Sequence, residues 1–280
     1  MNPYIEIIRP GNVIMAIIAI ILVAIVSHSI SIPIILAMIV VFFEISAGNV
    51  INDYFDYKID LINKPERPIP SGRIKLKTAR NYAYGLFLGG TICGFLITYI
   101  THNWIPFIIV LFTDITLYLY AYKLKSRPLI GNLTVGFMTG LCFAFGGFSI
   151  GTSQMIYTSI FLGFFAFVMT TAREITKDIE DIEGDKAEGA KTFPILYGTK
   201  ISAIITLILI ILDCVLCPLL YFQHIFSIYY LIIITIAVIL FIYAGILLIR
   251  NQDTETAAKV SKYLKIGMLI AFVSFAIGSF

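Results

Sequence analysis

Two groups of aspartates share one spacing, and their residue type and spacing suit the binding of a divalent cation. The offsets within each group are three and four residues; the members are Asp53, Asp56 and Asp60, and then Asp178, Asp181 and Asp185. At about 100° per residue, the three carboxylates of a group fall within roughly 60° of a helix surface. Like charges stacked in this way repel one another unless a cation neutralises them. Clustered carboxylates are ligands that Mg²⁺ prefers, and this ion commonly adds substrate phosphate oxygens.

Amide and basic side chains around both groups extend this chemistry. Asn49 and Asn52 lie beside the first group and Glu174 beside the second, and no His or Cys is near enough to favour zinc. Cations that could bind phosphate oxygens follow or flank the groups: Lys64, Arg67, Arg73, Lys123, Lys125, Arg173, Lys177 and Lys191. Acids for a metal next to bases for phosphate predict a diphosphate substrate held through Mg²⁺.

The elements that must position these groups are membrane helices. Of the 280 residues, 59% are hydrophobic and 13% are charged, whereas soluble domains carry about 25% charged residues. Apolar runs of about 20 residues recur, and lipid-exposed backbone must be helical, so we predict an all-α polytopic membrane protein that forms one membrane-embedded domain over residues 1–280. Nine candidate transmembrane helices lie near residues 12–30, 32–52, 82–101, 104–122, 131–150, 155–173, 199–221, 226–249 and 262–280.

The cations indicate how the chain is oriented in the membrane. All 20 Lys and Arg residues precede the first predicted span or fall in alternate connections. The positive-inside rule therefore places the N-terminus and these connections in the cytoplasm and the C-terminus outside. Two of these connections, about 53–81 and 174–198, are long and polar and contain the aspartates.

The same side of the membrane thus carries both aspartate groups. An aspartate at the bilayer centre costs about 2.5–3.5 kcal/mol, so these residues must line a wet cavity or bind cations. For either group alone, a solvated acidic face outside the bilayer is the alternative. Two such groups on one side favour a function.

Three prolines end the helix that carries the first group. Pro65, Pro68 and Pro70 lack a backbone N–H, and each disfavours helix in the residue before it. The segment is therefore either a semi-rigid loop that holds its cations over the carboxylates or a simple cytoplasmic linker.

Some polar residues inside the predicted spans have no assigned role. Glu44, Asp114 and Asp213 are intramembrane acids, for which an interhelical hydrogen bond and a catalytic role both stay open. Cys214 and Cys217 have the spacing of a redox or metal motif, but they lack partner ligands, so we predict core packing.

Two segments match a known pattern of residues. The first has Asn52 and three aspartates, followed by a proline-rich loop that runs to Gly72. The second runs from Arg173 through the other aspartates to Pro194. In order and separation they resemble the two signatures of the UbiA superfamily of intramembrane prenyltransferases, and the nine-span layout extends the resemblance over the whole chain.

The resemblance implies nine helices around a central cavity with cytoplasmic cap loops, and Mg²⁺-dependent transfer of a prenyl group from its diphosphate. The implied metal ligands are Asn52, Asp56, Asp60, Asp178, Asp181 and Asp185, of which Asp56, Asp60, Asp181 and Asp185 are the implied catalytic residues. The substrate-binding residues are predicted to be Arg9, Lys64, Arg67, Arg73, Tyr118, Lys123, Arg173 and Lys177. Of these, Tyr118 is chosen by position alone, as are Tyr122, Phe143 and Phe145, because a carbocation needs aromatic faces nearby.

The acceptor of the prenyl group is less sharply indicated. The two loops look closest to archaeal family members that make membrane ether lipids by joining geranylgeranyl diphosphate to the hydroxyl of geranylgeranylglyceryl phosphate. An aromatic acceptor, as in quinone pathways, is the alternative.

A secondary transporter or cation channel also suits intramembrane acids, although here they cluster at one face rather than the midplane. A CDP-alcohol phosphotransferase is disfavoured because its Asp-Gly-x-x-Ala-Arg element is missing. The expected partners are these substrates and membrane lipid, with no nucleic acid and no obligatory protein partner.

Overall fold

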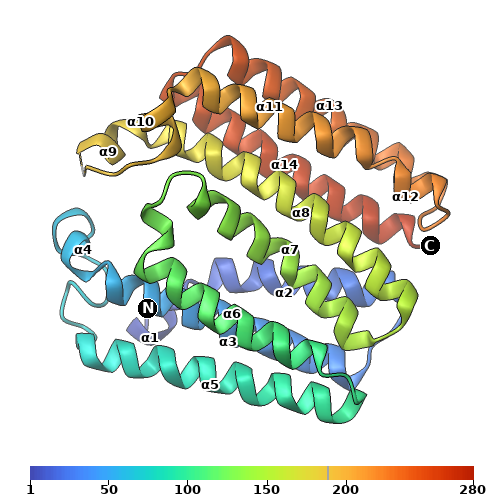
Figure 1. The fold of residues 1–280 in the computed structure, drawn as a ribbon, viewed down its shortest axis with the longest axis horizontal. Helices are drawn as coiled ribbons and strands as arrows, with labels where there is room; N and C mark the ends of the chain where they lie inside the picture. Colours follow the sequence, from blue (N-terminus) through green and yellow to red (C-terminus); the bar gives the residue numbers. More distant parts are fainter. Residues whose placement is uncertain (188) are drawn as a thin grey trace. The chain divides into compact units, whose positions relative to one another are not determined.

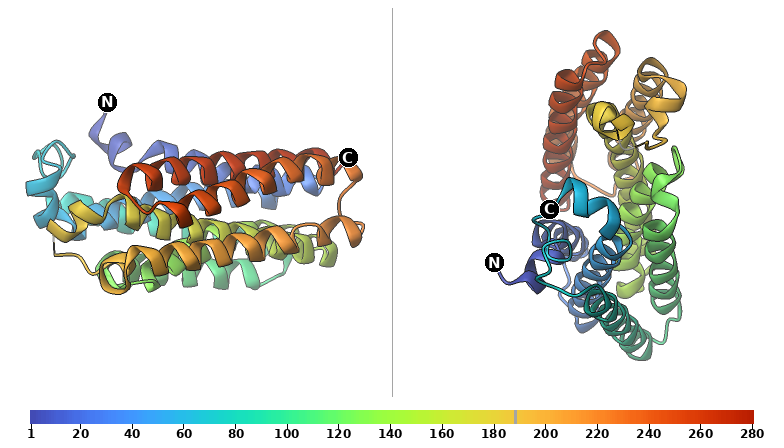
Figure 2. Two further views of the ribbon diagram at one scale, coloured as in Figure 1. Left: turned by 90° about the horizontal axis from the view of Figure 1, so that it is seen from above. Right: turned by 90° about the vertical axis from the view of Figure 1, so that its left-hand side faces the viewer.

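The computed structural model describes residues 1–187 and 189–280, and within these residues the regular elements are all helices (Figures 1 and 2). Eight described helices are long and apolar enough to cross a membrane, and α2 (Pro10–Val26) is a shorter apolar helix of 17 residues. The predicted all-α polytopic fold is confirmed, and the predicted count of nine spans includes α2.

The helices follow one another with short connections, apart from the longer loop of residues 64–75 between α4 and α5. Their bounds are α1 Pro3–Ile7, α2 Pro10–Val26, α3 Ile32–Phe55, α4 Tyr57–Asn63, α5 Leu76–Thr101, α6 Ile105–Tyr122, the 3₁₀ helix η1 Leu124–Ser126, α7 Ile130–Ile150, α8 Ser153–Glu180, α9 Ile182–Ala187, α10 Phe193–Tyr197, α11 Thr199–Leu216, α12 Leu219–Phe222, α13 Ile228–Arg250 and α14 Thr254–Gly278.

The chain forms two compact units. Unit 1 consists of Met1–Leu124 with Cys142–Ser159, and unit 2 consists of Lys125–Leu141 with Ile160–Phe280. Helices α7 and α8 each contribute one part to each unit. The first aspartate group belongs to unit 1 and the second to unit 2.

In unit 1, α3 packs against α2, α5 and α6. Glycine allows the close approach of α5, because a Cβ at Gly90 would lie 2.0 Å from Oε1 of Glu44. Glu44 is 4% exposed and lies at this contact between α3 and α5. Thr91 donates to Asp114 Oδ2 at 2.8 Å. This hydrogen bond joins α5 to α6, which favours the interhelical role for Asp114, and Glu44 lies in the same packing of α3 against α5.

The proline-rich segment after α4 is an ordered loop. The N–H of Ile74 donates to Pro68 O at 2.9 Å, and Ser71 Oγ donates to Arg67 O at 2.7 Å. Ile69 and Ile74 are 3% and 2% exposed, so the loop inserts two side chains into the core of unit 1. This agrees with the semi-rigid loop among the two predicted alternatives.

In unit 2, α7 and α8 approach closely through glycines. A Cβ at Gly140 would lie 2.4 Å from Gly163 O, and one at Gly136 would lie 2.8 Å from Phe167 O.

Farther along the chain, the Tyr230 hydroxyl donates to Cys217 O at 2.7 Å. Cys217 is a free, buried cysteine, in agreement with core packing.

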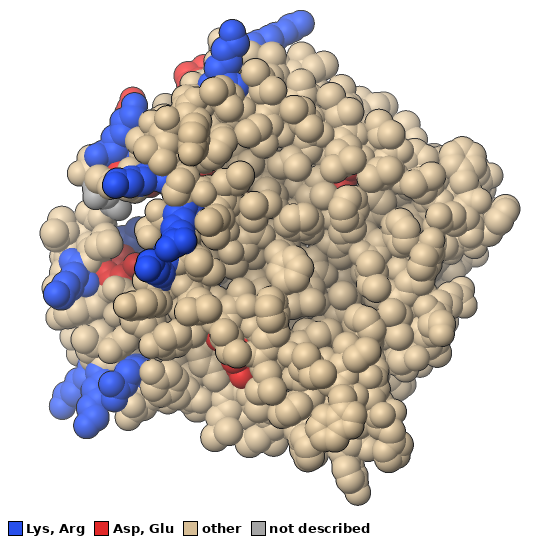
Figure 3. Space-filling view, in the orientation of Figure 1, with Lys and Arg blue, Asp and Glu red and all other residues tan. Residues whose placement is uncertain are grey.

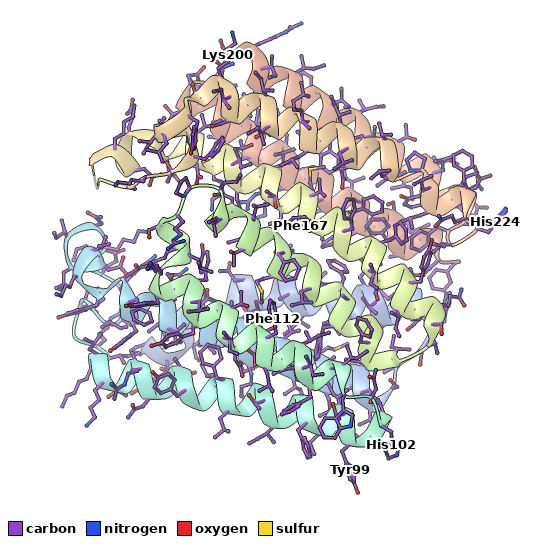
Figure 4. All side chains as sticks on the ribbon, in the orientation of Figure 1. Tyr99, His102, Phe112, Phe167, Lys200 and His224 are labelled. Atoms are coloured by element: carbon purple, nitrogen blue, oxygen red, sulfur yellow. The ribbon has the colours of Figure 1, made fainter. Side chains whose placement is uncertain are left out.

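Charge is distributed unevenly along the helices of each unit. On the face shown in Figure 3, Lys and Arg side chains lie near α4 and the start of α5, at the connection between α6 and α7, near α9, and where α11 begins and α13 ends. Figure 4 shows two of the three histidines at the other helix ends: His102 follows α5, and His224 follows α12. Each unit therefore has a cationic end, and this end carries its aspartates.

Candidate prenyl diphosphate site

The first aspartate group lies where α3 is followed by α4. Asp56 is the C-cap of α3 and the N-cap of α4. Helical hydrogen bonding continues through the junction: the Asp56 N–H donates to Asn52 O at 2.9 Å, and the Asp60 N–H donates to Asp56 O at 2.8 Å. Asp53 and Asp60 are 3% and 4% exposed, whereas Asp56 is half-buried. The carboxylates of one helical stripe therefore differ in their access to solvent.

Two arginines bind the buried carboxylates of this group. Arg9 forms an ion pair with Asp53 Oδ1, and Arg67 Nη1 lies 3.3 Å from the same oxygen. Arg67 Nη1 also donates to Asp60 Oδ2 at 2.7 Å. A buried carboxylate is costly unless it is paired, so these contacts explain how Asp53 and Asp60 are accommodated. They also bring the two guanidinium groups together.

Asn52 and Asp56 form a second type of contact within the group. Asn52 Nδ2 donates to Asp56 Oδ2 at 2.9 Å, which places an amide beside a half-buried carboxylate. Their oxygens are hard donors that suit Mg²⁺, which typically takes one or two carboxylates plus substrate phosphate and water. Within residues 1–187 and 189–280, no three His, Cys, Asp or Glu side chains gather as a metal site. The donor set in unit 1 alone thus fits a metal that phosphate helps to hold.

The second group lies at the end of α8 and in α9. The Asp181 N–H donates to Lys177 O at 2.8 Å, and the Asp185 N–H donates to Asp181 O at 2.9 Å. Asp178 is half-buried, and its Oδ2 accepts a hydrogen bond from Asn132 Nδ2 at 2.8 Å. Asp181 is exposed. The predicted helical stripe is therefore present in unit 2 as well.

The cations beside the second group bind a glutamate. Arg173 Nη1 lies 3.1 Å from Glu174 Oε1, and Lys177 Nζ lies 3.3 Å from Glu174 Oε2. Both cations were predicted to contact phosphate. Glu174 holds them next to the second aspartate group.

The remaining predicted substrate contacts lie in different surroundings. Lys64 and Lys123 are exposed at the cationic end of unit 1. Tyr118 packs edge-to-face on Phe55, the residue before Asp56, with ring centroids 5.4 Å apart. Tyr122 packs on the same ring, whereas Phe143 and Phe145 are 1% and 3% exposed and belong to the packed interior.

Arg73 is engaged by the N-terminal segment. Its guanidinium donates to both carboxylate oxygens of Glu6, at 2.7 and 2.8 Å, and its Nε donates to Ser71 Oγ at 3.0 Å. These hydrogen bonds hold the pKa of the Glu6 carboxyl below its ordinary value. The predicted contact of Arg73 with substrate stays a prediction, and the structure gives this side chain a structural partner.

Two residues beside the aspartate groups have contacts that the sequence motifs do not reveal. Asn132 lies outside both motifs, and the signal that points to it is an amide at the start of a span, just after a basic connection. Asp53 belongs to the first motif, but its spacing alone predicts no separate role for it. Its role depends on Arg9, which lies 44 positions away in the chain.

The chain resembles known proteins over nearly its whole length. A model of the UbiA prenyltransferase family matches residues 12–273. The chain is 72% identical over 280 residues to the digeranylgeranylglyceryl phosphate synthase of Methanobrevibacter smithii, which covers 100% of this chain and 99% of that protein.

Solved structures extend the likeness to the fold. One, described as giving structural and mechanistic insights into the biosynthesis of digeranylgeranylglyceryl phosphate synthase in membranes, has a TM-score of 0.87 and 43% identity and covers 99% of this chain and 97% of that chain. A UbiA homolog from Archaeoglobus fulgidus bound to DMAPP and Mg²⁺ has a TM-score of 0.66 and 16% identity, over 96% of this chain and 98% of that chain. The second likeness is one of fold alone. The family match and the 72% identity together establish that the chain belongs to the UbiA prenyltransferase family.

Proposed function

We propose that the protein is a digeranylgeranylglyceryl phosphate synthase, which transfers a geranylgeranyl group from geranylgeranyl diphosphate to the glycerol hydroxyl of geranylgeranylglyceryl phosphate. The observation that carries this proposal is the 72% identity, over the full chain, to a protein of that name. The local geometry supports the donor half of the reaction, because both units place carboxylates and cations at one end of membrane helices. The choice of a glycerol hydroxyl over an aromatic acceptor rests on the likeness to that protein.

The reaction requires the allylic C–O bond to break, with its electron pair leaving on the diphosphate. A bound Mg²⁺ would supply Lewis-acid neutralisation of this leaving group. The acceptor oxygen then forms the new ether bond to the allylic carbon and loses its proton. We assign the metal contacts to Asn52, Asp56 and Asp60 in unit 1 and to Asp178, Asp181 and Asp185 in unit 2. A bound Mg²⁺ in the Archaeoglobus fulgidus homolog supports the choice of ion.

Basic side chains have a complementary task in this scheme. Arg9 and Arg67 would bind phosphate oxygens through the guanidinium N–H groups that do not contact Asp53 or Asp60. Lys64 would add a mobile charge from the loop. Lys123, at the end of α6, would likewise add positive charge for the phosphate oxygens. In unit 2, Arg173 and Lys177 supply charge from α8. Tyr118 would present an aromatic face to the carbocation at the acidic end of α3.

The membrane arrangement follows the distribution of charge. We propose one membrane-embedded domain over residues 1–280, with the N-terminus and both aspartate groups in the cytoplasm and the C-terminus outside. Single cysteines introduced at Ser279 and at Asn2 in a variant without native cysteines would react with an impermeant maleimide from opposite sides of oriented vesicles. Reaction of both from the same side would overturn the topology.

The decisive experiment is prenyl transfer by the purified protein. It is incubated with geranylgeranyl diphosphate and, in parallel, with geranylgeranylglyceryl phosphate or 4-hydroxybenzoate, with Mg²⁺ or with a chelator. We expect an ether product with the glyceryl phosphate only, and none after chelation. Prenylation of 4-hydroxybenzoate instead would move the protein to the aromatic branch. Ion flux in liposomes without any transfer would favour a transporter.

A further inference from the structure

The N-terminal segment of unit 1 is docked against the first aspartate group, although its helix α1 has only five residues. Ile7 and Ile8 are 1% and 7% exposed and belong to a buried cluster with residues of α3, the proline-rich loop and α5. Tyr4 packs edge-to-face on Tyr82 of α5, with centroids 5.5 Å apart. Because a helix of this length has little stability of its own, these tertiary contacts must hold it in place.

Three polar ties fix the same segment. Asn49 Nδ2 donates to Ile8 O at 2.8 Å, and Asp53, one turn farther along α3, binds Arg9. One face of α3 therefore holds two consecutive residues of the segment. The third tie is the two-point contact of Glu6 with Arg73, which joins α1 to the proline-rich loop.

The backbone at Arg9 is constrained. Arg9 has φ 53° and ψ 74°, in the left-handed region, which costs a residue other than glycine roughly 1–2 kcal/mol. Its N–H donates to Glu6 O at 3.1 Å, and its carbonyl accepts from the Asn12 N–H at 2.9 Å. Contacts on both sides of Arg9 thus maintain a conformation that a free chain would leave.

This conformation places two guanidinium groups on one carboxylate oxygen. Arg9 uses Nη2 and Arg67 uses Nη1 in their contacts with Asp53 Oδ1. A guanidinium has five N–H donors, so each retains donors for an anion. The side chains of Arg9 and Arg67 are 33% and 22% exposed, so these donors can be reached.

We propose that Glu6, Arg73 and Asn49 are positioning residues that hold Arg9 beside Arg67 so that the pair binds a phosphate group of a substrate. This inference rests on the proposed function. Asp60 also binds Arg67, so Arg67 keeps its position without the N-terminal segment. The position of Arg9 depends on that segment. Loss of the ties therefore weakens phosphate binding and leaves the later steps of the reaction intact.

The test uses Glu6→Gln, Arg73→Gln, Asn49→Ala and the exchanged pair Glu6→Arg with Arg73→Glu in the full-length protein. The KM for geranylgeranyl diphosphate and for geranylgeranylglyceryl phosphate is measured separately, with kcat. We expect each single variant to raise one KM by roughly 3- to 10-fold with kcat nearly unchanged. Glu6→Gln and Arg73→Gln remove a charge-assisted two-point contact, and Asn49→Ala removes one neutral hydrogen bond to Ile8 O. The substrate whose KM moves identifies the phosphate. The exchanged pair should recover part of the loss, because both side chains are about a third exposed.

A matched control separates positioning from a general loss of surface charge. Glu255 and Lys259 form an exposed ion pair of 2.7 Å in unit 2, and Glu255→Gln should leave both KM values unchanged. Unchanged KM values in Glu6→Gln and Asn49→Ala would overturn the inference. A fall in kcat equal to the fall in kcat/KM would overturn it as well.

A second readout does not depend on prenyl transfer. Inorganic diphosphate should protect residues 3–13 of the wild-type protein from hydrogen exchange. The diphosphate concentration that gives half-maximal protection should be several-fold lower for the wild type than for Glu6→Gln. If this difference appears but the wild-type protein transfers no prenyl group, the positioning role stands and the proposed function fails. If transfer occurs and the difference is absent, the positioning role fails alone.

Discussion

The two aspartate groups have the same spacing but different partners. In unit 1, the guanidinium groups of Arg9 and Arg67 bind the aspartates themselves. In unit 2, the nearby cations bind Glu174, and Asp178 accepts a hydrogen bond from the neutral amide of Asn132. Equal spacing therefore produces two similar helical stripes, and distant parts of the chain decide what each carboxylate does.

This difference predicts unequal dependence on bound cations. The first group carries part of its neutralising charge within the protein, so its geometry is set before substrate binds. The second group has an exposed aspartate, Asp181, and a hydrogen bond from an amide that adds no charge. Mg²⁺ and substrate should therefore order unit 2 more than unit 1.

The largest expected effect comes from removing one solvent-accessible carboxylate from each group. Asp56→Ala and Asp181→Ala should each lower kcat/KM by more than about 100-fold, because a metal ligand matters at least as much as the residues that support it. Thermal unfolding of both variants in detergent should stay close to that of the wild type. Near-normal turnover in either variant would show that its aspartate group does not bind a metal that the reaction needs.

Asn132→Ala should have the next largest effect. Its loss frees Asp178 from the hydrogen bond that orients it, and changes of this kind cost roughly 10- to 100-fold in metal affinity or activity. The Mg²⁺ concentration for half-maximal activity should rise. Asn103→Ala is the control, because Asn103 makes a comparable side-chain contact with Phe148 O at 3.2 Å far from the aspartates. An unchanged Mg²⁺ requirement in Asn132→Ala would show that Asp178 needs no such support.

Equivalent substitutions at Asp53 and Asp178 compare the two groups directly. Asp53→Asn removes the charge that Arg9 and Arg67 share, and the loss of a buried hydrogen-bonded charge costs about 1–3 kcal/mol of stability. Asp178→Asn keeps an oxygen that can accept from Asn132 and should cost less than about 1 kcal/mol. Midpoints of denaturant-induced unfolding in detergent measure both values. Equal losses would contradict the assigned difference between ionic and neutral partners.

The sequence was sufficient for the features that repeat locally along the chain. Apolar runs predicted the membrane helices, and the offsets of three and four residues predicted a carboxylate stripe at the cationic end of each unit. The partners could not be predicted in this way, because Arg9 meets Asp53 and Asn132 meets Asp178 only after helices pack. Arg73 illustrates the same limit: its place in the loop predicted a substrate contact, yet Glu6, 67 positions away, binds it.

The smallest expected effect is a pH dependence of the tie between Glu6 and Arg73. Arg73 lowers the pKa of the Glu6 carboxyl, so the tie is complete above the unfolded value of about 4.3 and is lost only as pH falls through the lower folded value. Hydrogen exchange of residues 3–9, corrected for its intrinsic pH dependence, should therefore be constant from pH 8 to about pH 5 and rise below about pH 4. Glu6→Gln should show fast exchange throughout. Asp253 gives the counterpart in unit 2, because the Thr256 N–H lowers its pKa at the start of α14, and exchange there should rise in the same acidic range. A transition near neutral pH in the wild-type segment would mean that another group, rather than the Glu6 carboxylate, ties α1 to the loop.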